Sequence, residues 1–156
     1  MAPRRVSSCS PTFIRILLAD DFERFRSFTS SLLRKQPGFQ IVGHALDGPE
    51  AVQKAEELKP DLVVLDIGLP KLNGIEAARQ IRLVSPDSKL MFLTGNNDPE
   101  VAREALGTGA TGYVSKLDAA LELLSAVDAV LLGKQFVSTT LAGRGLTGTH
   151  KSPLAT

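Results

Sequence analysis

Five polar side chains that each follow an apolar run are the residues of this chain best suited to chemistry. They are two adjacent acids, a third acid, a hydroxyl and a primary amine: Asp20, Asp21, Asp66, Thr94 and Lys116. Each alone has an ordinary explanation, because an acid can cap a helix, a threonine can serve a loop and a lysine can be a solvated surface charge. If the fold gathers them in one pocket, three carboxylates, an ammonium and a hydroxyl could together bind a cation and a phosphoryl group.

Three carboxylates in one pocket repel one another, and the way this repulsion is relieved decides their chemistry. Two unit negative charges about 4 Å apart repel by roughly 4 kcal/mol at an effective dielectric constant near 20. Protonation, the lysine or a cation would relieve it. A few carboxylates with room for water molecules suit Mg²⁺, whereas Ca²⁺ takes a larger set of oxygen ligands. The two histidines, His44 and His150, lie in other parts of the sequence, which disfavours a zinc site. Mg²⁺ with a lysine and a hydroxyl supports phosphoryl transfer in which an aspartate oxygen attacks in line.

The element that must position Asp66 is the apolar run Leu-Val-Val-Leu at residues 62–65. An unbroken apolar run indicates a strand that is buried on both faces. Asp66 ends the run, and a Leu-Pro…Asn-Gly segment that ends at Gly74 follows with the residues of a turn. We therefore expect Asp66 at the carboxyl end of a central strand, where open parallel sheets bind their ligands.

Four further apolar runs indicate strands, and helical patterns separate them. These runs cover residues 13–19, 39–46, 89–93 and 111–115. Five strand–helix units in strict alternation predict an α/β fold, with a doubly wound five-stranded parallel sheet in a three-layer α/β/α arrangement. Right-handed crossovers, and a second strand whose mixed character suits an edge, favour the flavodoxin-like order 2-1-3-4-5. In that order the polar residues that follow the other four strands share one rim of the sheet.

Capping residues and apolar spacing predict where the helices between and after these strands begin and which faces they bury. Four polar residues are expected to cap the second to fifth helices: Asp47, Asn73, Asp98 and Asp118. The fifth helix is expected to pack through a stripe of leucines: Leu117, Leu121, Leu124 and Leu131.

The two ends of the chain lack this periodicity. Residues 1–12 are rich in arginine, serine and proline, and we expect a disordered leader. The segment 133–138 could dock back on the body. Glycine, threonine, serine and proline dominate from Leu141 on, so residues 134–156 are expected to end in a flexible tail and to contain no output domain.

Composition narrows the class of protein further. Of 156 residues, 43% are apolar and 22% charged, as in ordinary globular proteins, and the formal net charge of +1 gives no electrostatic case for nucleic acid or membrane. No run approaches the roughly 20 apolar residues that a membrane helix needs. The single cysteine, Cys9, excludes an internal disulfide, which fits a reducing compartment, and we expect a cytoplasmic protein.

Four motifs together resemble the receiver domain of two-component response regulators. They are Leu-Ala-Asp20-Asp21, Leu-Asp66-Ile-Gly-Leu-Pro70-Lys-Leu-Asn-Gly74, Leu-Thr94-Gly95 and Gly-Tyr113-Val-Ser-Lys116. The resemblance covers residues 13–133 and implies the flavodoxin-like (CheY-like) fold. The Leu-Leu-Ala-Asp-Asp opening and the Gly-Ala-Thr-Gly-Tyr-Val-Ser-Lys run look most like the NarL/FixJ (LuxR-type) subfamily.

This resemblance implies roles for the acids. Asp66 would accept a phosphoryl group from the phosphohistidine of a sensor histidine kinase. Asp21 and Asp66 would bind Mg²⁺ directly, Asp20 would act through water, and the backbone carbonyl of Gly68 would complete the protein ligands.

The resemblance also implies a switch. Lys116 would pair with the phosphoryl oxygens, Thr94 would turn inward to donate a hydrogen bond to the phosphoryl group, and Tyr113 would follow from outside to inside. The added charge and acceptors would then bias the face of the fourth helix. Homodimers that form on phosphorylation, through the first and fifth helices or through the fourth, are a further family expectation.

Two positions depart from the common receiver pattern. Leu117 follows Lys116 where many receivers have proline, and we expect a trans peptide bond because a cis bond before a residue other than proline costs about 2.5–4 kcal/mol. Gly68 stands where a larger side chain is commoner. The missing side chain should open the phosphoryl site to water and shorten the life of the phosphorylated form.

Three alternatives stay open beside a phosphoacceptor module that is not an enzyme for external substrates. One is a truncated NarL/FixJ-type transcription regulator, which would contact DNA only through a helix-turn-helix domain not present in this chain. A phosphatase with an aspartate nucleophile would need a second acid at position 68, which is glycine. A flavodoxin would need a phosphate-binding loop where Asp20 and Asp21 would repel phosphate. The last two are disfavoured.

Overall fold

The computed structural model describes residues 13–143, and the regions expected as a leader at 1–12 and as the last part of a tail at 144–156 lie outside the described residues. The strands are β1 (Ile14–Ala19), β2 (Phe39–Ala45), β3 (Leu62–Leu65), β4 (Lys89–Thr94), β5 (Gly112–Ser115) and β6 (Phe136–Val137). The helices are α1 (Glu23–Arg34), α2 (Gly48–Leu58), α3 (Gly74–Val84), α4 (Pro99–Leu106), α5 (Ala119–Leu131) and α6 (Thr139–Ala142), with a short 3₁₀ helix η1 (Lys116–Asp118).

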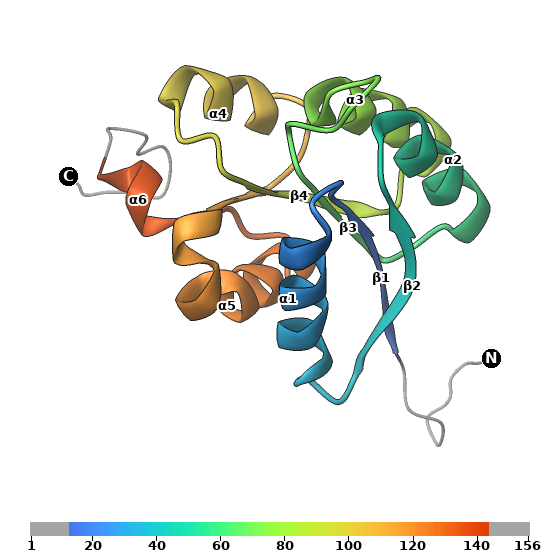
Figure 1. The fold of residues 1–156 in the computed structure, drawn as a ribbon, viewed down its shortest axis with the longest axis horizontal. Coiled ribbons are helices and arrows are strands. Elements are labelled where there is room, and N and C mark those ends of the chain that lie inside the picture. The colour runs from blue at the N-terminus through green and yellow to red at the C-terminus, as the bar shows by residue number, and fades with distance from the viewer. Residues whose placement is uncertain (1–12, 144–156) are drawn as a thin grey trace.

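These strands form one parallel sheet in the order β2-β1-β3-β4-β5-β6, with helices on both faces (Figure 1). The five predicted strands and their order are confirmed, and β2 lies at an edge as its mixed pattern predicted. The sixth strand was not predicted. It is two residues long and pairs only with β5, so hydrophobic periodicity had nothing to detect.

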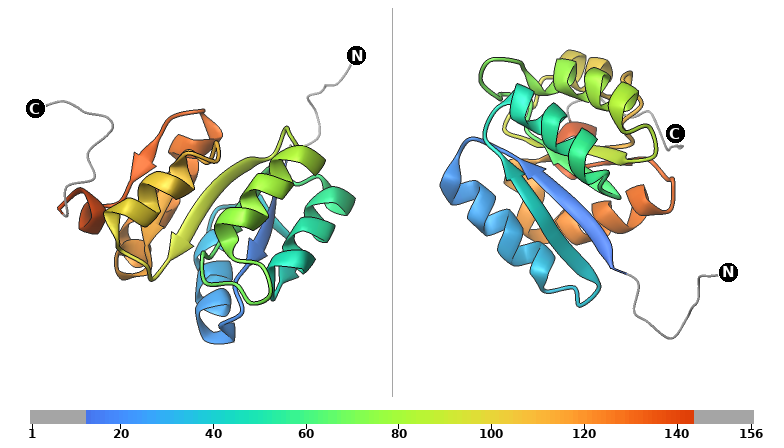
Figure 2. Two further views of the ribbon diagram at one scale, coloured as in Figure 1. Left: turned by 90° about the horizontal axis from the view of Figure 1, so that it is seen from above. Right: turned by 90° about the vertical axis from the view of Figure 1, so that its right-hand side faces the viewer.

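Two apolar layers hold the sheet between its helices. Figures 1 and 2 show α1 and α5 on one face and α2, α3 and α4 on the other. All four residues of β3 are buried, so the central strand contributes side chains to both layers. No helix within residues 13–143 combines the length and apolar character needed to cross a bilayer.

Three of the four predicted helix caps are confirmed by hydrogen bonds. The side chains of Asp47, Asn73 and Asp98 accept hydrogen bonds from backbone N–H groups in the first turns of α2, α3 and α4. The prediction for Asp118 was wrong, because its side chain makes no cap hydrogen bond to α5. Its carboxylate instead accepts hydrogen bonds from the backbone N–H and the hydroxyl of Thr140, at 2.9 and 3.0 Å.

The predicted packing stripe of α5 is confirmed only in part, because Leu124 and Leu131 pack, partly buried, against the core, whereas the other two leucines do not. Leu117 and Leu121 are 75% and 90% exposed. The buried positions are smaller on average: Ala119, Leu123, Ala126, Val127 and Val130. The helix carries apolar residues on more than one face, so periodicity did not distinguish the face that packs closely on the sheet.

The segment after α5 is ordered further along the chain than its composition suggested. Ser138 N–H donates to the carbonyl of Tyr113, and the buried Ser138 hydroxyl accepts a hydrogen bond from Ser115 N–H at 2.9 Å. Leu141, where the flexible tail was expected to begin, is fully buried in α6. Backbone pairing and one apolar anchor therefore dock a segment of polar composition.

Candidate functional site

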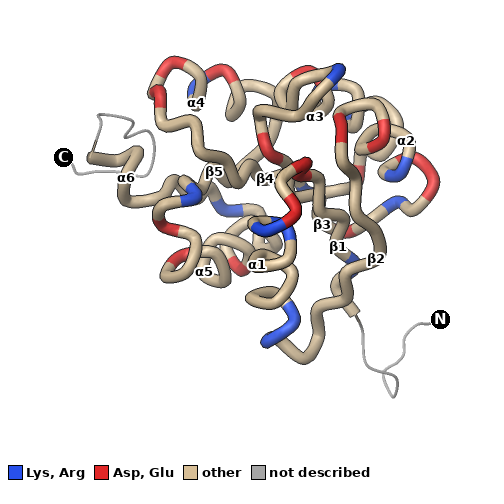
Figure 3. Tube along the Cα trace, viewed as in Figure 1, with Lys and Arg blue, Asp and Glu red and all other residues tan. Residues whose placement is uncertain are grey.

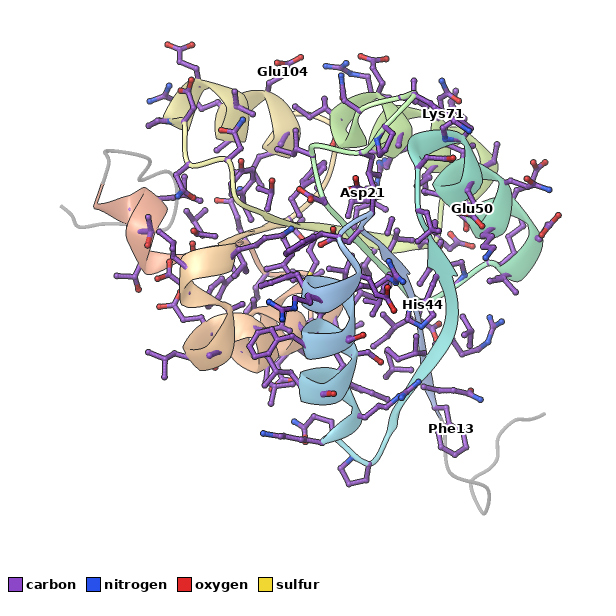
Figure 4. All side chains as sticks on the ribbon, viewed as in Figure 1. Phe13, Asp21, His44, Glu50, Lys71 and Glu104 are labelled. Carbon is purple, nitrogen blue, oxygen red and sulfur yellow. The ribbon has the colours of Figure 1, made fainter. Side chains whose placement is uncertain are left out.

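The three predicted acids converge at the carboxyl ends of β1 and β3. Asp66 N–H donates to the carbonyl of Ala19 and Asp20 N–H to that of Ala45, so strand pairing extends to the acids and fixes their backbones on one rim. One carboxylate oxygen from each of Asp20, Asp21 and Asp66 lies within 4.8 Å of the others. Asp20 and Asp66 are 7% and 9% exposed, whereas Asp21 is exposed to solvent. Figure 3 shows acidic positions on the loop after β1, and Figure 4 places Asp21 on that loop.

Lys116 closes this cluster from the end of β5, as predicted. Its Nζ lies 2.9 Å from Asp20 Oδ2 and 3.1 Å from Asp66 Oδ2. The same ammonium sits 4.6 Å from the centre of the Phe25 ring of α1, in reach of a cation–π interaction. One amine is therefore shared by two acids that come from different strands.

Burial changes the ionisation of the cluster. Desolvation raises the pKa of the Asp20 carboxyl above its usual value, although Phe22 N–H and Lys116 stabilise the anion. For Lys116, burial lowers the pKa, but the hydrogen bond to Asp20 and the charges of Asp66 and Asp20 outweigh burial and raise it overall. The cluster holds more negative than positive charge, and one ammonium does not neutralise three carboxylates.

The donor set fits a hard divalent cation. Carboxylate oxygens are the protein ligands of Mg²⁺, and the exposed Asp21 leaves water access beside the two buried acids. No histidine or cysteine belongs to the clusters of potential ligands found within residues 13–143. Asp20, Asp21 and Asp66 are the side chains that would hold the ion.

The loop from β3 to α3 fixes the position of Asp66. Gly74 N–H donates to the carbonyl of Ile67 at 2.7 Å, and a Cβ atom added at Gly74 would lie 2.1 Å from the carbonyl oxygen of Asp66. Gly74 is therefore required for the close approach of its backbone to the Asp66 carbonyl. This constraint is stronger than the turn that the sequence around Gly74 predicted. Gly68 differs, because a Cβ atom there would meet nothing within 4 Å. Its N–H makes a long hydrogen bond of 3.3 Å to Asp66 Oδ1.

Thr94 and Tyr113, the predicted switch residues, lie on adjacent strands. Thr94 is buried at the end of β4, and its hydroxyl oxygen accepts a hydrogen bond from Asn96 N–H. Tyr113 is fully buried, with its hydroxyl donating to the carbonyl of Asn96 at 2.8 Å and its ring 6.1 Å from that of Phe92. Burial raises the pKa of the Tyr113 hydroxyl far above its usual value. Tyr113 thus occupies the inward position and is not a surface aromatic.

Two residues at the site were missed by the sequence analysis. Arg26 Nη1 donates to the carbonyl of Asp20 at 2.9 Å, and Phe25 supports Lys116. Both lie on the first turn of α1, and which side of a helix faces the site depends on packing that periodicity describes only coarsely. The Lys116–Leu117 bond is trans as predicted, because residues 13–143 contain no cis peptide bond.

Comparisons with known proteins agree with this geometry. The family model for the response regulator receiver domain matches residues 16–128, and the chain belongs to that family. It is the receiver domain of a two-component response regulator, similar to members of the LuxR/NarL type.

Particular relatives show how far the similarity extends. The transcriptional regulatory protein DegU of Brevibacillus brevis is 36% identical over 80% of this chain and 52% of its own length. LiaR of Bacillus subtilis is 35% identical over 85% and 63%. The crystal structure of a LuxR-family response regulator from Aurantimonas sp. superposes with a TM-score of 0.80 at 35% identity, covering 85% of this chain and 94% of that one. The chain thus spans between half and two thirds of these two curated relatives.

Proposed function

We propose that Asp66 accepts a phosphoryl group from the phosphohistidine of a sensor histidine kinase and that the aspartyl phosphate switches the domain. The observation that carries this proposal is the convergence of Asp20, Asp21 and Lys116 on Asp66 at the end of the central strand. Membership of the receiver family supports the choice of kinase as donor. Since the phosphoryl group stays on the protein until water removes it, the module is not an enzyme for external substrates.

Each residue of the cluster would do a defined part of the chemistry. An oxygen of Asp66 forms a bond to phosphorus while the bond from phosphorus to the imidazole nitrogen of the donor breaks. Lys116, already 3.1 Å from that carboxylate, stabilises negative charge on the transferred oxygens. Mg²⁺ held by Asp21, Asp66 and the carbonyl of Gly68, with Asp20 acting through water, would supply further charge neutralisation.

The phosphoryl group would then act on Thr94 and Tyr113. A phosphoryl group adds about −1.5 to −2 charges and three acceptor oxygens. The Thr94 hydroxyl, whose oxygen accepts a hydrogen bond from Asn96 N–H, would thereby gain an acceptor for its own proton. Asn96 links the two switch residues, because its N–H donates to Thr94 and its carbonyl accepts from Tyr113. A movement of Thr94 would therefore reach Tyr113 and the start of α4.

Intact-protein mass spectrometry after incubation with acetyl phosphate and Mg²⁺ tests this proposal. We expect one phosphoryl group on the wild type, none on Asp66→Asn, and wild-type labelling of Asp87→Asn, which changes an exposed acid outside the cluster. Labelling of Asp66→Asn to the wild-type level would overturn the assignment.

A role in transcription is a second candidate, which the relatives favour. DegU and LiaR are named transcriptional regulatory proteins, and this chain matches 52% and 63% of their lengths. We propose that the receiver controls a DNA-binding output that lies outside the described residues or on a partner. Intact mass measurement of the protein as it occurs in its cell, followed by DNA binding with and without acetyl phosphate, tests this candidate.

A further inference from the structure

A basic groove lies between α1 and β2, beside the acidic cluster but distinct from it. Its volume is about 340 Å³. Six residues line it: Arg26, Ser27, Ser30, Ser31, Arg34 and His44. Figure 4 shows His44 on β2, next to α1, and in Figure 3 positive positions mark both ends of that helix. The lining consists of hydrogen-bond donors and cations and contains no acid.

Helix spacing and a strand irregularity build this groove. Arg26, Ser30 and Arg34 follow one another at intervals of four residues and so lie along one stripe of α1. The register of β2 against β1 slips by one residue between the pairs Ile16–Ile41 and Leu17–Gly43. This bulge reverses the alternation of the strand, so His44 rather than Gly43 faces α1.

The arginines of the groove are not engaged in ion pairs within the described residues. Arg26 and Arg34 form no salt bridge with any acid within residues 13–143, and Arg26 donates only to a backbone carbonyl. Burial lowers the pKa of the His44 imidazole, and the positive charges of Arg26, Arg34 and Lys54 of α2 lower it further. An anion in the groove would relieve this repulsion.

Two buried polar atoms of the groove have no hydrogen-bond partner within the described part of the chain. They are Oγ of Ser30 and Nδ1 of His44, and Ser30 is only 5% exposed. A helical serine can donate back to the carbonyl four residues earlier, yet Ser30 does not do so. Because an unpaired buried hydroxyl costs free energy, a ligand with several acceptor oxygens fits this position.

We propose that the groove binds a small phosphate-bearing anion, either inorganic phosphate or a phosphate monoester, through the guanidinium groups of Arg26 and Arg34 with hydrogen bonds from Ser30 and His44. Guanidinium groups match the geometry of phosphate oxygens, and hydroxyls and an imidazole add neutral donors. The site is independent of phosphoryl transfer at Asp66. Arg26 lies at the boundary between the two, since it lines the groove and also donates to the Asp20 carbonyl.

Titration followed by NMR of the histidine side chains tests this inference, because the chain has only two histidines and one lines the groove. Inorganic phosphate and glycerol 3-phosphate are added separately, at constant ionic strength and without Mg²⁺, to the wild type and to Asp66→Asn. We expect saturable shifts of the His44 signals in both proteins and a rise in the pKa of His44. Equal shifts and affinities in the wild type and in Asp66→Asn would show that binding in the groove does not depend on the proposed phosphoacceptor. Whichever of inorganic phosphate and glycerol 3-phosphate binds more tightly identifies free phosphate or a phosphate ester as the preferred ligand.

Matched arginine variants of α1 distinguish a specific anion-binding site from general electrostatic attraction of the anion to a basic helix. Arg34→Gln removes an exposed cation of the groove and should weaken binding about tenfold, the loss of one charge-assisted hydrogen bond. Arg24→Gln removes an exposed cation of α1 outside the groove and should leave binding unchanged. Absence of saturable binding, or equal weakening by both substitutions, would overturn the proposal.

Discussion

Lys116 donates a hydrogen bond to Oδ2 of Asp66 at 3.1 Å, which joins the ends of β5 and β3 across 50 residues of chain. The two side chains are largely buried, at 19% and 11% exposure. The pair places a cation beside the carboxylate proposed to accept the phosphoryl group, and it also offsets repulsion among the acids. Stability and chemistry thus depend on the same ammonium.

Replacement of Lys116 by alanine should lower the free energy of unfolding by about 1–3 kcal/mol in the absence of Mg²⁺, since it leaves buried carboxylates without their donor. Mg²⁺ should restore part of this loss because a cation can take over the neutralisation. Urea denaturation with and without Mg²⁺ measures both effects. Lys134→Ala, at an exposed lysine, is the control, and equal stability of the two variants would contradict the prediction.

The stabilising effect of Mg²⁺ should depend on pH through Asp20. Burial raises the pKa of Asp20, so its folded form binds a proton more readily than the unfolded chain does. Without metal, this residue therefore stabilises the fold at acid pH and loses that contribution as the pH rises through its folded pKa. A cation needs the ionised form, so the metal effect should have the opposite slope.

Thermal denaturation at a series of pH values measures this slope. At a Mg²⁺ concentration of 100 Kd the ion should stabilise the domain by about 2.7 kcal/mol at neutral pH. The rise in Tm should shrink as the pH falls through the raised pKa of Asp20. In Asp20→Asn the decline should shift to lower pH, and an identical decline in that variant would count against Asp20 as the titrating group.

Gly68 should set the lifetime of the phosphorylated form. A Cβ atom there would meet no protein atom within 4 Å, so we expect Gly68→Met to fold and its side chain to cover the phosphoryl site against water. We expect slower dephosphorylation of Gly68→Met than of the wild type, with Gly68→Ala between them. Decay of the phosphorylated mass after removal of acetyl phosphate provides the rates, and equal rates for all three proteins would exclude this role.

Gly74 should tolerate no side chain, in contrast to Gly68 of the same loop. A methyl group at position 74 would overlap the carbonyl oxygen of Asp66, so the loop must shift. Gly74→Ala should cost about 1–3 kcal/mol of stability and also lower the rate of phosphorylation, because the backbone that carries Asp66 moves. Gly68→Ala is the matched control in urea denaturation, and a Gly74→Ala variant as stable as that control would show that the close approach is not required.

Ser138 should anchor the segment after α5. Its hydroxyl accepts the hydrogen bond of the buried Ser115 N–H, and its own N–H donates to Tyr113. Ser138→Ala leaves Ser115 N–H unpaired and should destabilise the domain by about 1–3 kcal/mol. Faster hydrogen exchange at Ser115 and in β6 would locate the effect, whereas unchanged exchange at both would argue against the anchor. Ser31→Ala, at an exposed serine, controls for loss of a hydroxyl.

The sequence allowed the sheet and the main site residues to be predicted for one physical reason. Asp20, Asp66, Thr94 and Lys116 follow apolar runs, and the carboxyl ends of parallel strands meet on one rim, so strand order alone brings these residues together. No such rule fixes the rotation of a helix. The contacts of Phe25 and Arg26 of α1, and the buried face of α5, depend on side-chain packing.

Contacts made through backbone or single polar groups were likewise beyond prediction. Strand β6 is too short to show a hydrophobic period. The sequence around Asp118 suits a helix cap equally well, and only the fold shows that its carboxylate binds Thr140 instead. The packing of Gly74 against Asp66 joins residues eight positions apart. The turn residues of this loop predicted where the loop lies but not this contact.

Chemical identification of the phosphorylated residue tests the central claim most directly. Borohydride reduction of the acetyl phosphate-treated protein converts an aspartyl phosphate to homoserine, which peptide mass spectrometry then locates. We predict homoserine at position 66 in the wild type and at no position in Asp66→Asn. Homoserine at position 20 or 21 instead, or at no position in a wild-type protein that folds and binds Mg²⁺, would contradict the assignment of Asp66 as the phosphoacceptor.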